Sequence, residues 1–349
     1  METQTNRPSD LKRAFSEDGA HKTHIGGQAL IEGIMMRGRT HWSVALRSSD
    51  GSIHTEEHAL SAKGNRPAWL SWPLIRGCVA LVDSLALGFK ALEISAQHAL
   101  SDEAKTDRRT AEPDDEVDIA RHPGESKQVE FGRGDMVLSA LLGLALGLAL
   151  FVFVPAVLAN LVVGSYDTNT FAWNCVDGVA RVAVFVFYVW LIARMKDIRV
   201  MFAYHGAEHK TIHCYEHGCD LTVANARSFP RLHVRCGTAF LIMVMIIAIL
   251  VYTIVPLDAL ISAWGVTDDV AQFALVIGAR IVLLPLIAGL SYEISVKWAG
   301  SHPENPLVKV LLWPSMQMQY LTTAEPDDAQ LECAIAAMNL IVERESTAD

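Results

Sequence analysis

Residues 136–163 form an uninterrupted run of 28 residues without a charged side chain, and this run limits the folds that the chain can adopt. Three further apolar segments follow, near residues 173–192, 236–255 and 271–290. A helix needs about 20 apolar residues to cross a hydrocarbon core of roughly 30 Å. The sequence therefore predicts an α-helical integral membrane protein with about four transmembrane helices, in contact with the lipid bilayer.

The connections between these segments predict their orientation. Residues 164–172 and 256–270 contain no Lys or Arg, whereas the connection 193–235 contains seven. Basic residues gather on the cytoplasmic side of membrane proteins. We therefore expect a multi-pass protein of the cell (plasma) membrane, with the 193–235 connection and both termini in the cytoplasm.

The charge and the cysteines exclude two classes of protein. A net charge of −10 gives no sign of a surface for nucleic acid, so we expect no nucleic-acid partner. The six cysteines are scattered without a C-x-x-C pair, which argues against a disulfide framework.

The polar stretches predict units outside the bilayer. Residues 1–23 predict a disordered tail. Residues 24–100 predict a cytosolic β-rich unit with an Asp-Gly hairpin turn, followed from about residue 69 by an amphipathic helix that is either interfacial or re-entrant. In the segment 101–134, 16 of 34 residues are charged, which indicates a solvated linker.

The second half of the chain divides into a membrane domain and a tail. We assign residues 135–293 to the membrane domain and residues 294–349 to a cytosolic helical tail. Within this tail a helix-start signal at 325–328 precedes apolar residues at helical spacing, which predict an amphipathic helix that docks on the other cytosolic parts. Its expected apolar face consists of Leu331, Ala334, Ile335, Met338 and Ile341 or Val342.

Four of the 13 histidines follow one another at intervals of four residues in the predicted cytoplasmic connection: His205, His209, His213 and His217. Residues four apart lie on one face of a helix. The first two belong to the order H-x-x-E-H, which is the inverted zinc-peptidase motif. We therefore interpret His205 and His209 as metal ligands, most simply of Zn²⁺, and Glu208 as the catalytic base on metal-bound water.

The sequence leaves the third ligand open among His213, Glu216, Glu293 and Glu32. The ladder of four histidines is about 18 Å long, so all four cannot hold one ion. We expect His233, Cys236 and Glu293 at the cytoplasmic ends of the third and fourth predicted spans, close to the histidine ladder.

Three alternatives for these residues stay open. The first is a polar helix whose histidines form hydrogen bonds or contact lipid head groups. The second is a structural zinc site of His213, Cys214, His217 and Cys219. The third is a Cys–His nucleophile pair of His233 and Cys236, although a buried thiol at a helix start is the simpler interpretation of Cys236.

Five stretches of the chain resemble the YqhQ family: 26–38, 204–216, 231–238, 291–293 and 325–328. This is a domain-of-unknown-function family of bacterial multi-pass membrane proteins that carries the label of a predicted metal-dependent enzyme. The resemblance covers residues 24 to 343. It implies a location in the bacterial inner membrane and a metal-dependent activity, and it implies no substrate.

Two functions follow as hypotheses. The first is a metal-dependent, zinc-type hydrolase that acts on a membrane-associated substrate at the cytoplasmic membrane face. The alternative is a non-catalytic membrane scaffold or assembly factor that binds a cytosolic or membrane partner.

Overall fold

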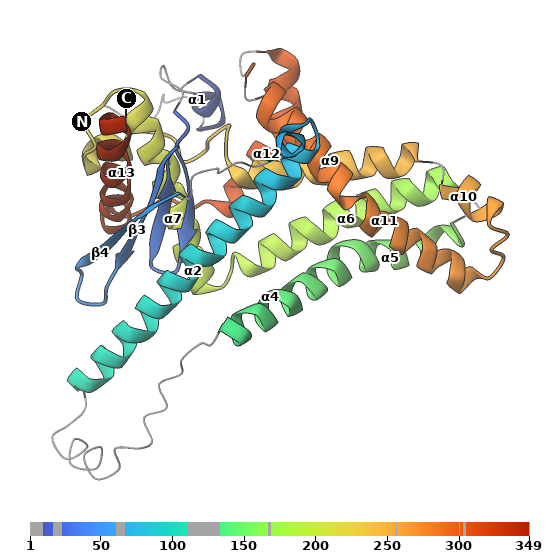
Figure 1. Cartoon of the computed structure of the whole chain (residues 1–349), viewed down its shortest axis with the longest axis horizontal. Coiled ribbons are helices and arrows are strands. Elements are labelled where there is room, and N and C mark those ends of the chain that lie inside the picture. Colours follow the sequence, from blue (N-terminus) through green and yellow to red (C-terminus); the bar gives the residue numbers. More distant parts are fainter. Residues whose placement is uncertain are drawn as a thin grey trace, which may run out of the picture.

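The computed structural model describes residues 10–16, 23–60, 67–110, 133–166, 169–255, 257–299, 301–302 and 305–348. Most of these residues are helical, and four strands near the N-terminus form a sheet. In Figure 1 the sheet lies at one end of the molecule and a group of long helices extends away from it. A mostly helical protein with an N-terminal β-rich unit is therefore confirmed.

The sheet is antiparallel, with the strands in sequence order: β1 (Gly26–Leu30), β2 (Gly33–Arg37), β3 (His41–Arg47) and β4 (Ile53–Ala59). The β3–β4 turn contains Gly51 at a φ of +83°, a left-handed conformation that glycine adopts without strain. This is the hairpin that the Asp-Gly pair predicted.

Two helices cover one face of the sheet. They are α7 (Lys196–Glu216) and α13 (Asp328–Ala348). The common core combines Ile34 and Met36 from β2, Ile212 from α7, and Leu331 and Met338 from α13. Burying each of these side chains contributes about 1.5–3 kcal/mol. The predicted apolar face of the C-terminal helix is therefore the face that packs.

The opposite face of the sheet meets α2 (Ile75–Thr110), a helix of 36 residues that follows the short 3₁₀ turn Ala68–Ser71. Ala91 packs against the sheet residues Leu30 and Trp42. Earlier in the same helix, Val82 and Leu85 are more than half exposed. The helix is thus amphipathic, and its ten last residues lie within the predicted linker.

Two predicted segments fall largely outside the described residues. The predicted tail includes α1 (Asp10–Ser16), whose Ala14 packs against Leu232 and Met316, while residues 1–9 and 17–22 lie outside. Residues 111–132 of the predicted linker also lie outside.

The apolar segments all form helices. The first comprises α4 (Arg133–Leu148), a π-helical turn (Ala149–Phe153) and α5 (Val154–Val163). The others are α6 (Thr170–Ile192), α9 (Gly237–Ile254) and α11 (Asp269–Tyr292), which continues into a π-helical stretch (Glu293–Ala299). Connecting helices are α8 (Val223–Arg227), α10 (Leu257–Ala263) and α12 (Pro306–Thr322).

Three of these helices are long and apolar enough to cross a membrane, within the described residues: 138–163, 170–192 and 269–299. The predicted third span corresponds to α9, whose apolar part, Phe240–Ile254, is shorter. The structure therefore supports three of the four predicted spans and does not confirm the fourth.

Charged residues inside this helical group pair with one another. Asp177 of α6 contacts Arg181 at 2.9 Å and Arg280 of α11 at 2.6 Å. Arg280 also donates to the Asn174 side chain at 2.9 Å. Pairing of this kind is how ionisable groups are retained within apolar helices.

Candidate metal site

The histidine face of α7 is covered by residues 229–236, which connect α8 to α9. His209 donates Nδ1–H to the Arg231 carbonyl at 2.5 Å, and Nε2 of His213 lies 3.0 Å from the Leu232 carbonyl. Lys210 donates to the Phe229 carbonyl at 2.8 Å. Two histidines of the ladder and Lys210 therefore hold this connection along the helix.

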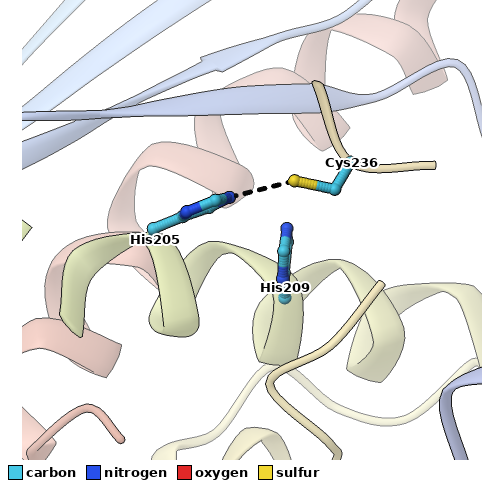
Figure 2. Close-up of side chains that lie close together, drawn as sticks. All are labelled: His205, His209 and Cys236. Atoms are coloured by element: carbon cyan, nitrogen blue, oxygen red, sulfur yellow. Dashed lines mark hydrogen bonds between the residues drawn. The ribbon is translucent and has the colours of Figure 1, made fainter. Parts of the chain in front are cut away.

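At the end of the connection, Cys236 joins the first two histidines of the ladder (Figure 2). One donor atom each from His205, His209 and Cys236 lies within 4.8 Å of the others. The Cys236 Sγ is 3.1 Å from Nε2 of His205. We call these three residues the metal group; among the residues that the structure describes, no other three His, Cys, Asp or Glu side chains gather in this way.

Backbone carbonyls orient both imidazoles of the metal group. Nδ1–H of His205 donates to the Thr322 carbonyl at 2.9 Å, as that of His209 does to Arg231. A carbonyl oxygen only accepts, so each Nδ1 carries the proton and each Nε2 is directed to the metal group. Nε2 of His209 is buried and forms no hydrogen bond within the described structure. Metal-binding histidines have this arrangement, with the second nitrogen held by a carbonyl.

The charges of the metal group favour a thiolate. Burial opposes ionisation, but the neighbouring His205 and His209 outweigh it and hold the pKa of Cys236 well below its usual range. Burial likewise disfavours charge on His205, but the adjacent Cys236 thiolate outweighs it and raises the pKa of His205 to about 9. The thiolate is the form of cysteine that binds metals.

Glu208 lies on α7 between the two histidines of the metal group and faces the sheet. Its Oε1 accepts a hydrogen bond from the Gly27 backbone N–H at 2.8 Å. Burial raises the pKa of Glu208, against the opposing effect of His205 and His209. The close approach requires glycine, because a Cβ at residue 27 would lie 2.9 Å from the Glu208 carboxyl carbon.

A cavity of about 260 Å³ lies between β1, β2, α2, α7 and the start of α9. It contains side chains of the metal group and the candidate base, so a small molecule in it would contact them. The polar side chains that line it are Gln28, Arg37, Ser84, Glu208, His209, His233, Arg235 and Cys236.

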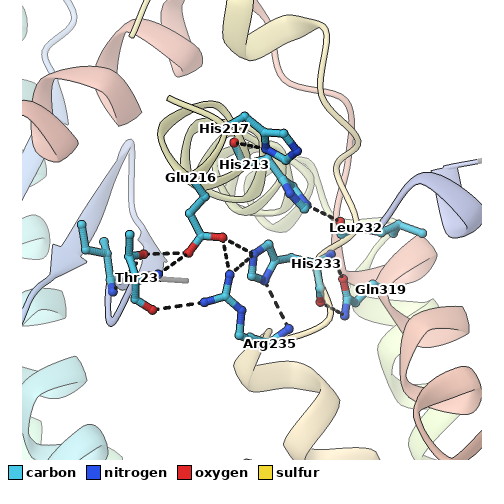
Figure 3. A network of polar contacts seen from close by, with 9 residues as sticks. Thr23, His213, Glu216, His217, Leu232, His233, Arg235 and Gln319 are labelled. Atoms are coloured by element: carbon cyan, nitrogen blue, oxygen red, sulfur yellow. Dashed lines mark hydrogen bonds and ion pairs between the residues drawn. The ribbon is translucent and has the colours of Figure 1, made fainter. Parts of the chain in front are cut away.

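The other predicted ligands lie apart from the metal group. The carboxylate of Glu216 is fully buried and accepts from Thr23 N–H at 2.9 Å and from the Arg235 guanidinium (Figure 3). Glu293 pairs with Arg76 and accepts from its Nε at 2.7 Å. Glu32 is an exposed turn residue at a φ of 50°.

The later histidines of the ladder bind backbone rather than a common ion. His213 contacts Leu232 as above, and Nδ1–H of His217 donates to the His213 carbonyl at 2.7 Å. The thiol of Cys214 donates to the Asp220 carbonyl at 3.5 Å. The structure thus brings together His205, His209 and Glu208 from the sequence motif, and leaves His213 and Glu216 in neighbouring networks.

Cys236 is the member of the group that the motif did not identify. Sequence reasoning placed it at the mouth of the spans but interpreted it as a buried thiol. Two histidines one turn apart on a helix need a third ligand from another segment. The signal available was that His233 and Cys236 are the first His, Cys, Asp or Glu residues after Cys219 and Asp220, which directly follow the ladder.

Comparisons with known proteins agree with the motifs. The family described as "Protein of unknown function (DUF1385)" matches residues 72–344. The chain is 30% identical over 326 residues to "Uncharacterized protein YqhQ" of Bacillus subtilis (strain 168), which covers 93% of this chain and 94% of that protein. No solved structure matches. Both matches span the segments that form the metal group.

Proposed function

The chain belongs to the DUF1385 family, as the resemblance to YqhQ predicted, and we propose that it is a metal-dependent hydrolase that acts at the cytoplasmic face of the cell membrane. The observation that carries the proposal is the meeting of His205, His209 and Cys236 within 4.8 Å, beside the buried carboxylate of Glu208.

The donor set fits a catalytic zinc ion. Two imidazole nitrogens and one thiolate are typical zinc ligands, and three protein ligands leave a fourth position open, as in catalytic rather than structural sites. Zinc held there would lower the pKa of a bound water to about 7. The carbonyls of Thr322 and Arg231 keep both Nε2 atoms in position for such an ion.

Glu208 is the candidate base. The Gly27 N–H binds Oε1 and fixes the carboxylate at the wall of the cavity. Burial raises the pKa of Glu208, which makes its carboxylate a stronger base than one in water. The second oxygen can then accept a proton from a water or substrate in the cavity.

The neighbouring helices support a substrate at the membrane surface. Cys236 immediately precedes the apolar helix α9, and three residues separate α7 from the apolar helix α6. The connection 193–235, which contains both histidines, is the one with seven basic residues. By the positive-inside rule the cavity then faces the cytoplasm, next to the head groups.

Metal analysis of the purified protein tests the site. We expect about one zinc per chain in the wild type and loss of zinc in the His205→Ala/His209→Ala double variant and in Cys236→Ala. Zinc should be unchanged in His217→Ala, because within the described structure the His217 ring contacts its own helix and Phe229 and lies outside the metal group. A wild type without metal contradicts the proposal. Metal retained by the double variant contradicts the ligand assignment.

Glu208→Gln separates catalysis from scaffolding. It should retain zinc but fail to restore function in a strain that lacks the gene. If Glu208→Gln restores function while deletion of residues 325–349 does not, the chain is a non-catalytic scaffold.

One observation favours a second candidate, a cysteine nucleophile. The 3.1 Å contact between Cys236 Sγ and His205 Nε2 is the geometry of a thiolate–imidazolium pair. A metal-free wild type that loses function on alkylation of Cys236 would establish this alternative, whereas zinc that protects Cys236 from alkylation would exclude it.

A further inference from the structure

We infer that the cavity beside the metal group binds a phosphate group, and that Arg37 is the side chain that recognises it. This inference deepens the proposed function by naming a substrate class, and its catalytic meaning rests on that function. The binding itself can be tested without any assumption about the reaction.

Arg37 is the last residue of β2, and its half-buried side chain lines the cavity. Within the described residues it forms no ion pair and no hydrogen bond. The guanidinium group offers five N–H donors in a planar fork that matches the oxygens of a phosphate. The unpaired guanidinium of Arg37, in a cavity that also contains side chains of the metal group, is therefore the group to which we assign phosphate recognition.

A second feature makes the same cavity attractive to an oxyanion. Gly237, the first residue of α9, lines it, and this helix of 18 residues has no side-chain cap at its N-terminus. Uncapped N–H groups and the helix dipole favour negative charge at that end.

Arg235 forms a fixed part of the cavity wall. Its guanidinium pairs with the buried Glu216 and donates to the Thr23 carbonyl at 3.1 Å (Figure 3). This pairing holds Arg235 in place and compensates its charge. Among the described residues that line the cavity, Arg37 therefore remains the cation that is available to a ligand.

The size of the cavity limits what enters it. About 260 Å³ is below the 300–1,000 Å³ typical of sites for drug-sized ligands, so it suits a head group rather than a whole lipid or a peptide. The Arg37 guanidinium from β2 and the first N–H groups of α9 suit a group with several oxygens. Leu87 of α2 also lines the cavity, and exposed Leu85 lies two residues away on that helix. The phosphate can belong to a phospholipid or to a free phosphate ester.

Calorimetry on the full chain in phosphatidylcholine nanodiscs tests the phosphate site, with inorganic phosphate as the probe. Arg37→Gln should weaken phosphate binding about tenfold or more, the loss expected for a charge-assisted hydrogen bond. The matched control is Arg39→Gln, two residues along, whose side chain is exposed and outside the cavity. It should bind as the wild type does, and both variants should keep the wild-type melting temperature and zinc content.

Competition distinguishes the two sources of the phosphate. Nanodiscs that also contain phosphatidic acid should weaken the apparent binding of inorganic phosphate if the site takes a lipid head group. If instead glycerol phosphate competes and phosphatidic acid does not, the site takes a free ester. Either result supports the phosphate site.

Failure of this inference differs from failure of the proposed function. A zinc-containing wild type that binds no phosphate, or an Arg37→Gln variant that binds it as the wild type does, overturns the phosphate site alone. A zinc-free wild type whose phosphate binding still depends on Arg37 overturns the metal and leaves the phosphate site standing.

Discussion

At the scale of single residues, the chemistry of α7 depends on which nitrogen of each imidazole carries a proton and donates it to a backbone carbonyl. Thr322 and Arg231 accept the Nδ1 protons of His205 and His209, which leaves both Nε2 atoms facing Cys236. In the metal-free protein, Nε2–H of His205 donates to the thiolate. A metal ion would take the place of that proton.

Zinc binding should therefore release protons from His205. The folded metal-free pKa is about 9, above the usual 6.5, so the ring is charged at pH 7 and must lose one proton to bind a metal. Cys236 is already a thiolate and releases none. We expect release of about one proton per zinc near pH 7, declining as the pH rises through about 9.

Titration calorimetry in two buffers of different ionisation enthalpy measures this release. His217→Ala should give the wild-type value. Equal heats in both buffers near neutral pH would show that His205 is neutral before zinc binds, contrary to the prediction.

Gly27→Ala should damage the site and Gly26→Ala should not. A Cβ at residue 27 would lie 2.7 Å from the Met35 carbonyl oxygen and 2.9 Å from the Glu208 carboxyl carbon, whereas one at residue 26 meets nothing within 4 Å. The crowding should cost about 1–3 kcal/mol and push Glu208 from its place. Chemical unfolding measures the first effect, and complementation of a strain without the gene measures the second.

At the scale of elements, the site depends on where α12 ends and α13 begins. The chain between them crosses α7 at Gly206, with a hydrogen bond of 2.8 Å from Ala324 N–H to the Phe202 carbonyl. The Thr322 carbonyl, at the end of α12, holds His205. The C-terminal segment therefore positions one metal ligand as well as completing the core.

Gly206→Ala should separate these elements. Its Cβ would lie 2.1 Å from the Ala324 carbonyl oxygen, too close for any contact. Alanine favours a helix by about 1 kcal/mol, but overpacking costs about 1–3 kcal/mol and should outweigh it. We expect a lower melting temperature and weaker zinc binding. Gly278→Ala, in α11 with nothing within 4 Å, should destabilise neither the fold nor the site.

At the scale of the whole molecule, two connections between the apolar helices lie close together. Ser165, after α5, donates to Asp269 at the start of α11 at 3.0 Å. The α5–α6 and α9–α11 connections therefore meet at one end of the molecule. With 18 residues α9 is roughly 27 Å long, close to the thickness of a hydrocarbon core. Four crossings, with both connections on one face of the membrane, stay a prediction.

Cysteine labelling in intact cells tests this topology. A membrane-impermeant maleimide should label Thr267→Cys, in an exposed connection, before lysis. Asn339→Cys, on the exposed face of α13, should react only after lysis. The native cysteines of the wild type set the background. Labelling of both variants before lysis would contradict cytoplasmic termini.

Local patterns in the sequence were enough for the apolar helices, the β3–β4 hairpin and α13, but not for α1 or the last ten residues of α2. Apolar runs predict helices because a helix satisfies its backbone hydrogen bonds within itself. Alternating apolar residues on both sides of an Asp-Gly turn predict a hairpin because the two paired strands are neighbours in the sequence. The apolar face of α13 and the shared face of His205 and His209 follow from the helical period. These predictions need only neighbours within a few residues.

The partners of those elements required the tertiary structure. Cys236 is 31 residues from His205 in sequence, and Gly27 is 181 residues from Glu208. Cys236, rather than His213 or Glu216, joins the two histidines because of where residues 229–236 pass along α7. Glu293 forms an ion pair with Arg76 instead. Periodicity determines which face of a helix a side chain occupies, but packing of distant segments determines what that face meets.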